Sequence, residues 1–359
     1  MKQERLTNVL ALMKERHINQ IIVSDPAAIF YLTGEWIHPG ERLLALVIRE
    51  DGKHSLVVNK MFQIKSSLGI EIIYIDDVDN GIEILANQLE AGKIGVDKTW
   101  PAKFLLGLMQ QTGQPVSEFV LGSEVMDDVR AHKTEEEKEL MRAASRDNDE
   151  AVGRLIKLLP QELTELEMTE KLAEIYKELG NSGMAFEPIV AYGANGADPH
   201  HETNDDRVKP GDAVILDIGG VKNDYCSDMT RTVFYKEVSD RHRDIYEIVL
   251  EANKRAIAAV KPGVKFSEID AAARDYITEK GYGEYFTHRT GHFIGIECHE
   301  AGDVSAANDR VVEPGNIFSI EPGIYIQGDI GVRIEDLIIA TEDGYENLNH
   351  YNKELMIVG

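Results

Sequence analysis

The stretch LDIGGVKNDYCSDMTRTVFY, residues 216–235, sets two carboxylates into a segment that otherwise has the composition of two paired β-strands. Asp217 ends an apolar run, and Asp228 lies eleven residues further on, across a Gly-rich turn. Strands of such apolar, β-branched composition are largely buried. A buried carboxylate without a partner becomes protonated or costs several kcal/mol. These two acids therefore require compensating positive charge.

The same arrangement occurs a second time in the chain. PGDAVILD (210–217) and PGNIFSIE (314–321) both place Pro-Gly before a β-forming run that ends in an acid. A further acid follows each run, so the repeat supplies Asp217, Asp228, Glu321 and Glu335. A duplicated half-domain with pseudo-twofold symmetry would bring the four together. The basic residues nearby in sequence are Arg231 and Arg333, which leaves a negative charge that two divalent cations would cancel.

Histidines flank the duplicated acids on both sides. HRTGHFIGIECHE (288–300) contributes His288, His292 and His299, and ADPHHETND (197–205) contributes His200 and His201. Carboxylates with one or two imidazoles form an oxygen-rich site, which suits Mn²⁺, Co²⁺, Fe²⁺ or catalytic Zn²⁺ and disfavours a thiolate structural site. The two cysteines, Cys226 and Cys298, are too few for a disulfide framework, and we expect both to be reduced and structural.

The charge of the chain excludes two kinds of partner. The 359 residues carry 38 Lys and Arg against 63 Asp and Glu, a net charge of -25. This charge repels phosphate backbones and anionic membrane surfaces, so we expect neither nucleic acid nor membrane as a partner. The first residues space their apolar side chains helically among charged ones, unlike a signal peptide. A cytoplasmic location is therefore expected.

The length and pattern of the chain predict two domains. Residues 1–125 alternate β-forming runs with helical stretches and predict an α/β domain, and residues 126–359 predict an α+β domain that contains the repeat. In the second domain, a capping box of Thr134 and Glu137 predicts a long helix that Pro160 closes. Further helix starts are predicted at Thr164, near Ser239 and at Ser267.

Five motifs resemble those of the pita-bread metallopeptidases, the family that includes methionine aminopeptidase, aminopeptidase P and prolidase. The motifs are LDIGG, SDMTRT, TGHFIG, SIEPGIY and GVRIED, in this order. The resemblance implies a set of five metal ligands: Asp217, Asp228, His292, Glu321 and Glu335. It also implies two divalent ions bridged by Asp228 and Glu335, with Mn²⁺ or Co²⁺ favoured over Zn²⁺ or Fe²⁺. FYLTGEWIHPGERLLALVI (30–48) is similar to the amino-terminal domain of creatinase and of the proline-specific members, which implies a creatinase-like domain before a pita-bread catalytic domain.

The resemblance also assigns roles around the metals. His200 and His299 match two active-site histidines of the family that do not bind metal, whereas His201 has no counterpart. Tyr325 and Arg333 match residues that hold the ligands in place. Glu321 is expected to bind metal and also to carry the proton of the attacking water.

The resemblance implies hydrolysis of Xaa-Pro bonds in dipeptides, as in prolidase. A dipeptidase must bind the substrate carboxylate near the metals, and Arg289 and Arg310 are the candidates, because arginine can pair with a carboxylate through two hydrogen bonds. The alternatives are an Xaa-Pro aminopeptidase acting on longer peptides, a creatinase-like C–N hydrolase and a non-enzymatic binding protein of the same fold. The resemblance further implies a homodimer.

Overall fold

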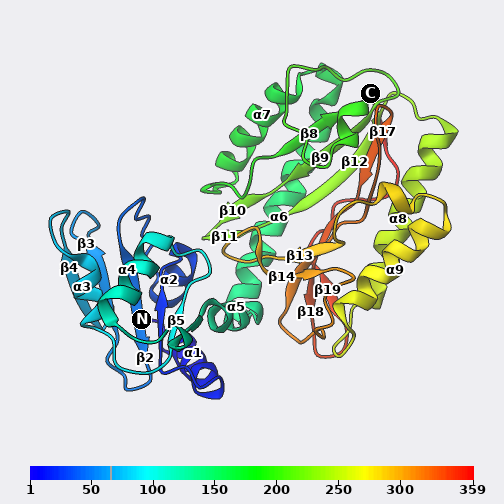
Figure 1. The fold of residues 1–359 in the computed structure, drawn as a ribbon. Helices are drawn as coiled ribbons and strands as arrows, with labels where there is room; N and C mark the ends of the chain where they lie inside the picture. The colour runs from blue at the N-terminus through cyan, green and yellow to red at the C-terminus, as the bar shows by residue number, and fades with distance from the viewer. Residues whose placement is uncertain (65–66) are drawn as a thin grey trace. The chain divides into compact units, whose positions relative to one another are not determined.

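The chain folds into two compact units, Met1–Arg130 and Ala131–Gly359. The computed structural model describes residues 1–64 and 67–359. The expected domain boundary after residue 125 falls inside helix α5 (Ser123–Ala131), and the units divide near the end of that helix (Figure 1). None of the helices in the described part of the chain combines the length and the apolar character that a membrane span requires.

The first unit is an α/β domain, as the sequence predicts. Its mixed sheet has the strand order β4-β3-β2-β1-β5-β6, antiparallel from β1 to β3 and parallel elsewhere. The strands are β1 (Gln20–Val23), β2 (Leu44–Arg49), β3 (Ser55–Asn59), β4 (Glu71–Ile75), β5 (Ile94–Val96) and β6 (Phe119–Leu121). The helices are α1 (Gln3–Glu15), α2 (Pro26–Thr33), α3 (Gly81–Ala86) and α4 (Ala102–Thr112). Strands β2 and β3 are buried along their whole length, as apolar runs of this kind require.

The second unit contains two pairs of packed helices (Figure 1). They are α6 (Glu135–Leu158) with α7 (Glu165–Glu178), and α8 (Asp240–Ala259) with α9 (Phe266–Glu279). Thr134 and Thr164 begin the first pair through capping boxes, and the hydroxyl of Ser239 caps α8, as predicted. The predicted helix start at Ser267 is wrong. Helix α9 begins one residue earlier, at Phe266, and the hydroxyl of Ser267 donates to Asp309 and does not cap the helix.

The sheets of the second unit fall into two halves. The first half has the sheets β20-β12-β9-β8 and β11-β10-β7, and the second half has β14-β13-β15-β18-β19 and the hairpin β16-β17. The first-half strands are β7 (Gly183–Met184), β8 (Ile189–Tyr192), β9 (Ala213–Ile218), β10 (Gly220–Lys222), β11 (Tyr225–Cys226), β12 (Met229–Tyr235) and β20 (Ile357–Val358). The second-half strands are β13 (Gly291–Phe293), β14 (Glu300–Val304), β15 (Ile317–Ile320), β16 (Gly323–Ile326), β17 (Ile330–Arg333), β18 (Asp336–Ala340) and β19 (Tyr345–Asn347).

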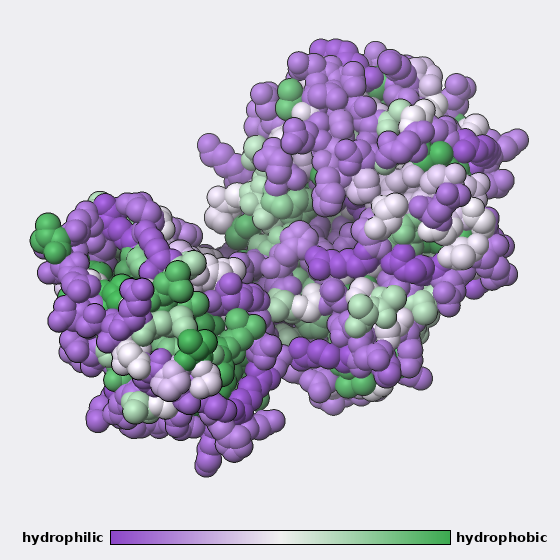
Figure 2. Space-filling model, viewed as in Figure 1, coloured by the Kyte–Doolittle hydropathy of each residue, from purple (hydrophilic) through white to green (hydrophobic). Residues whose placement is uncertain are grey.

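Each half is built around its own helix pair. One apolar core joins α6 and α7 to β8, β9 and β12, and another joins α8 and α9 to β13, β15, β17 and β18. The antiparallel pair β9 and β12 corresponds to the antiparallel pair β15 and β18, and both pairs carry acids of the repeat at one end. This is the duplicated α+β organisation that the sequence predicts. Hydrophilic residues dominate the face seen in Figure 2, consistent with the high charge of the chain.

Candidate metal centre

The first repeat places its two acids at the end of one strand pair. Asp217 lies on β9 opposite Thr230 of β12, and Asp228 immediately precedes β12. Both acids are buried, with 9% and 4% of their surface exposed. Between them, an added Cβ at Gly219 would lie 2.2 Å from the carbonyl oxygen of Ser227. Only glycine allows this close backbone approach, which brings the two acids into one cluster.

The second repeat places its acids in the same cluster. Glu321 follows β15, and its Oε1 accepts a hydrogen bond of 3.1 Å from the hydroxyl of Ser319. Glu335 precedes β18, is 2% exposed, and accepts a 2.8 Å hydrogen bond at Oε2 from Oγ1 of Thr230. The backbone N–H of Glu335 also donates to the carbonyl of Thr230 at 3.1 Å. Thr230 therefore joins the two repeats at the acids.

His292 lies between acids of the two repeats. Its Nε2 is 3.5 Å from Oδ2 of Asp228 and 3.6 Å from Oε1 of Glu321. Burial alone would lower the pKa of His292, but these two carboxylates outweigh burial and raise it. An added Cβ at Gly291 would lie 1.8 Å from the carbonyl oxygen of Ser319, so glycine is needed beside the histidine for β13 to approach β15.

The acid cluster is short of positive charge and of hydrogen-bond donors. Three buried oxygens accept no hydrogen bond from any residue that the structure describes: Asp217 Oδ1, Asp228 Oδ1 and Glu335 Oε1. Burial raises the pKa of Asp217 to about 7, with nearby Asp228 and Glu321 adding to the shift and Arg333 opposing it. Burial and the neighbouring carboxylates also raise the pKa of Glu335 well above its ordinary value. A divalent cation supplies both the charge and the missing partner, so the donor set fits one.

Tyr325 and Arg333, which are expected to hold the metal ligands in place, lie beside the four acids. Arg333 donates from one terminal nitrogen to Oδ2 of Asp217 at 2.6 Å and from the other to the hydroxyl of Tyr325 at 2.9 Å. Its Nε donates to Oγ1 of Thr230 at 3.1 Å. The Tyr325 hydroxyl also makes a 2.8 Å hydrogen bond with Nε2 of His288. Arg333 thus fixes one oxygen of Asp217 and leaves Oδ1 available.

The other nearby arginine has different partners. Arg231 donates to the carbonyl of Glu335 at 2.6 Å and to Oδ1 of Asp336 at 2.7 Å. The ammonium of Lys353 binds Oδ2 of the same aspartate. Burial opposes the shift, but the two cations lower the pKa of Asp336. Arg231 therefore orients the backbone at Glu335 and neutralises Asp336, and it does not neutralise the acids of the repeat.

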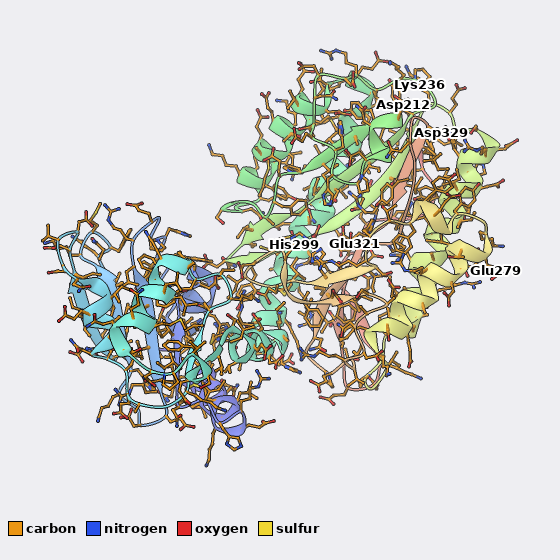
Figure 3. All side chains as sticks on the ribbon, in the orientation of Figure 1. Asp212, Lys236, Glu279, His299, Glu321 and Asp329 are labelled. Atoms are coloured by element: carbon orange, nitrogen blue, oxygen red, sulfur yellow. The ribbon has the colours of Figure 1, made fainter. Side chains whose placement is uncertain are left out.

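The acids and most of the predicted histidines line a single cavity of about 630 Å³. The charged and polar residues of its lining are Glu187, Asp217, Asp228, Glu321, Glu335, His200, His288, His292, His299, Arg289, Arg333 and Cys298. Phe186, Ile189 and Pro199 add an apolar wall. His299 and Glu321, labelled in Figure 3, belong to this lining. A volume in this range accommodates a small ligand.

Arg310 and His201 do not line this cavity. Arg289 is exposed and lines the cavity, but Arg310 lines a separate cavity of about 340 Å³ with Phe266 and Phe293. The expectation that Arg310 lies beside the acids is corrected accordingly: its carbonyl accepts a 3.0 Å hydrogen bond from the backbone of Phe266, which ties its loop to the start of α9. His201 makes a 2.6 Å hydrogen bond with Glu165, away from the cavity lining.

No functional role was expected for His288 or Cys298, but both line the cavity. His288 contacts the Tyr325 hydroxyl, and the thiol of Cys298 donates to Oδ2 of Asp228 at 3.2 Å. Both cysteines are free, as expected, but Cys298 is part of the site and not only of the core. The contact between Cys298 and Asp228 spans 70 residues, so the sequence held no local signal for it beyond proximity to His299.

An α/β unit followed by an α+β unit with duplicated acids around one cavity defines a class of metal-dependent hydrolases, and comparison with known proteins identifies the family. The model of metallopeptidase family M24 matches residues 139–342, and that of the creatinase/prolidase N-terminal domain matches residues 5–132. The chain belongs to metallopeptidase family M24. Its fold, its peptidase class and the use of divalent metal that characterises the family are thereby confirmed.

Individual relatives match over nearly the whole chain. An uncharacterized peptidase of Staphylococcus aureus strain MRSA252 is 36% identical over 352 residues, 97% of this chain and 99% of the relative. The crystal structure of dipeptidase PepE from Mycobacterium ulcerans has a TM-score of 0.93 at 33% identity, covering 99% of this chain and 97% of that one. The Xaa-Pro dipeptidase from Bacillus anthracis has a TM-score of 0.89 at 32% identity, covering 99% of both chains.

Proposed function

We propose that this metallopeptidase hydrolyses Xaa-Pro dipeptides with two divalent ions. The observation that carries the proposal is the cluster of four carboxylates in one cavity with His292 and the exposed Arg289. Three of the four have a buried oxygen without a partner among the described residues. The structural likeness to a dipeptidase and to an Xaa-Pro dipeptidase supports it. The apolar wall of Phe186, Ile189 and Pro199 offers a surface for a proline ring.

The five ligands of this proposal are Asp217, Asp228, His292, Glu321 and Glu335. We assign Asp228 and Glu335 as the shared ligands. The oxygen-rich set with one imidazole supports Mn²⁺ or Co²⁺, with Zn²⁺ or Fe²⁺ as alternatives. When bound, such ions polarise the scissile carbonyl and make water nucleophilic near neutral pH.

Within this scheme the chain handles protons through Glu321. Burial opposes the shift, but His292, His288 and Arg333 lower the pKa of Glu321, so its carboxylate is ionised near neutral pH and able to accept a proton. We assign it to take the proton of the attacking water and deliver it to the proline nitrogen as the C–N bond breaks. This delivery is needed because the leaving group is a secondary amine.

The two histidines without a ligand role bind the substrate in this scheme. His200 and His299 are both exposed within the cavity lining. The cavity walls remove part of the hydration of His299, and this partial desolvation, together with the charge of His292, lowers its pKa. The imidazole of His299 is therefore neutral near pH 7 and can donate one hydrogen bond. A donor aimed at the developing oxyanion is most valuable in the transition state.

A chelator experiment tests the metal requirement. Exhaustive removal of metal should abolish hydrolysis of Leu-Pro, and Mn²⁺ or Co²⁺ should restore it, with two ions bound per chain by elemental analysis. Unchanged hydrolysis by the demetallated protein would rule out this mechanism.

Substrate length is tested through Arg289, which we assign to the carboxylate of the dipeptide. The ratio kcat/KM should be much higher for Leu-Pro than for Leu-Pro-amide or Leu-Pro-Gly. Arg289→Ala should raise KM for Leu-Pro by about tenfold or more, since a charge-assisted pair contributes about 1.5–3 kcal/mol. Arg310→Ala is the matched control, because Arg310 lines the other cavity. Equal kcat/KM for the three substrates would favour an Xaa-Pro aminopeptidase.

We also propose that the enzyme is a cytoplasmic homodimer. Apolar side chains are exposed on the first unit, among them Trp36 at 38% and Leu106 at 58%, and Figure 2 shows apolar residues gathered on its visible face. Such surfaces are typical of interfaces. The two free cysteines agree with a reducing compartment. Sedimentation analysis that finds only a monomer at micromolar concentration would contradict the dimer.

A further inference from the structure

A second set of ligand atoms lies beside the acid cluster. Imidazole nitrogens of His292 and His299 and the Sγ of Cys298 all lie within 4.8 Å of one another. The two imidazole rings are 4.1 Å apart between centroids and tilted by 40°. Three donors at this spacing can reach a single cation. Two nitrogens and one sulfur form a softer ligand set than the carboxylates of the repeat.

The thiol of Cys298 lies beside a buried carboxylate. Cys298 is 7% exposed, and its Sγ donates a 3.2 Å hydrogen bond to Oδ2 of Asp228. Asp228 is 4% exposed, and its other oxygen, Oδ1, accepts no hydrogen bond from the described part of the chain. A cation bound to Sγ would therefore lie next to a buried carboxylate that has an unused oxygen. Binding replaces the S–H bond by a bond from sulfur to the cation, and the proton leaves to solvent.

We propose that Cys298 and His299, together with His292 of the five-ligand set, form an alternative site for a soft divalent cation such as Zn²⁺ or Cd²⁺. Thiolate and imidazole prefer these ions to Mn²⁺, which prefers oxygen. His292 is shared with the five-ligand set, and to that extent this inference rests on the proposed function. Because one imidazole nitrogen cannot bind two ions, a soft ion in this site draws His292 away from the catalytic ions. A soft ion in excess therefore inhibits the Mn²⁺-loaded enzyme.

The test uses Cd²⁺ added to the Mn²⁺-loaded enzyme. Wild type should develop the ultraviolet charge-transfer absorbance of a cadmium thiolate and release bound Mn²⁺ as Cd²⁺ is added. Cys298→Ser should lack the absorbance and bind Cd²⁺ about tenfold or more weakly, since even indirect losses at metal sites reduce affinity by 10–100-fold. Cys226→Ser is the matched control, because its thiol donates to the carbonyl of Ile296 and lies outside the ligand set. It should retain the absorbance of wild type.

Three results would overturn the inference: no thiolate absorbance in wild type, absorbance that persists in Cys298→Ser, or absorbance that is lost in Cys226→Ser. If Cys298→Ser does not fold, His299→Asn decides, since it keeps the thiol and should weaken Cd²⁺ binding. Wild-type affinity in His299→Asn would also refute the site. The absorbance requires no substrate, so its outcome is independent of whether Leu-Pro is hydrolysed before Cd²⁺ is added.

Discussion

Two buried aspartates, Asp217 and Asp336, both pair with arginine, but their environments differ. Asp336 is fully buried and has both oxygens occupied, one by Arg231 and the other by Lys353. Asp217 has one oxygen bound by Arg333, and its Oδ1 has no partner among the described residues. Neighbouring cations lower the pKa of Asp336 in spite of its burial, whereas burial raises that of Asp217. A buried acid with both oxygens satisfied needs no further partner, whereas a buried acid with an oxygen left over is a candidate for binding a ligand.

The largest effect is expected from Asp217→Asn. The change keeps the shape of the side chain and removes the charge that would bind metal. We expect kcat/KM for Leu-Pro to fall by about 10³-fold or more, because the metal supplies several kcal/mol of transition-state stabilisation. Elemental analysis should show reduced metal content. Wild-type metal content and activity in this variant would contradict a role of Asp217 in binding metal.

Asp336→Asn should act on stability instead. The change leaves the buried Arg231 and the half-buried Lys353 without the carboxylate that pairs with both. Breaking such a buried pair costs about 3–5 kcal/mol, which urea unfolding measures as a decrease in the free energy of unfolding. The folded fraction should still bind metal. Stability equal to wild type would contradict the structural role of this pair.

The same comparison applies to two histidines. His299→Asn should lower kcat by about 10²–10³-fold, as removal of an oxyanion donor does, while metal content stays at the wild-type level. His201→Asn should keep kcat and lose stability, because His201 pairs with the buried Glu165. Loss of metal in His299→Asn, measured in the presence of Mn²⁺, would contradict the assignment of His299 as a substrate-binding residue.

The smallest effect concerns two serines near helix starts. Ser239 caps α8, so Ser239→Ala should lower the free energy of unfolding by about 1 kcal/mol. Ser267 caps no helix and donates to an exposed Asp309. Ser267→Ala should therefore change the free energy of unfolding by less than about 0.5 kcal/mol. Paired thermal melts measure the difference, and equal shifts would mean that Ser267 contributes as much as a cap.

The sequence by itself determined much of this protein. The capping boxes at Thr134 and Thr164 follow from residues three positions apart, and the order of acids around the repeat shows where strands end. Hydrogen bonds within one turn and apolar periodicity along one strand depend on neighbours in the chain, so the residues alone report them. The two-domain organisation follows from the same local patterns, and the acid cluster was predicted because one such pattern occurs twice.

Only the tertiary structure decided which oxygens remain without partners. Arg333 reaches Asp217 across 116 residues, and Arg231, which is closer in sequence to the first acids, binds Asp336 instead. The same folding carries Arg310 into a different cavity and places Cys298 against the metal-site acids. Such pairings are set by the packing of the two halves against each other, and sequence spacing holds no information on which side chains then compete for one carboxylate.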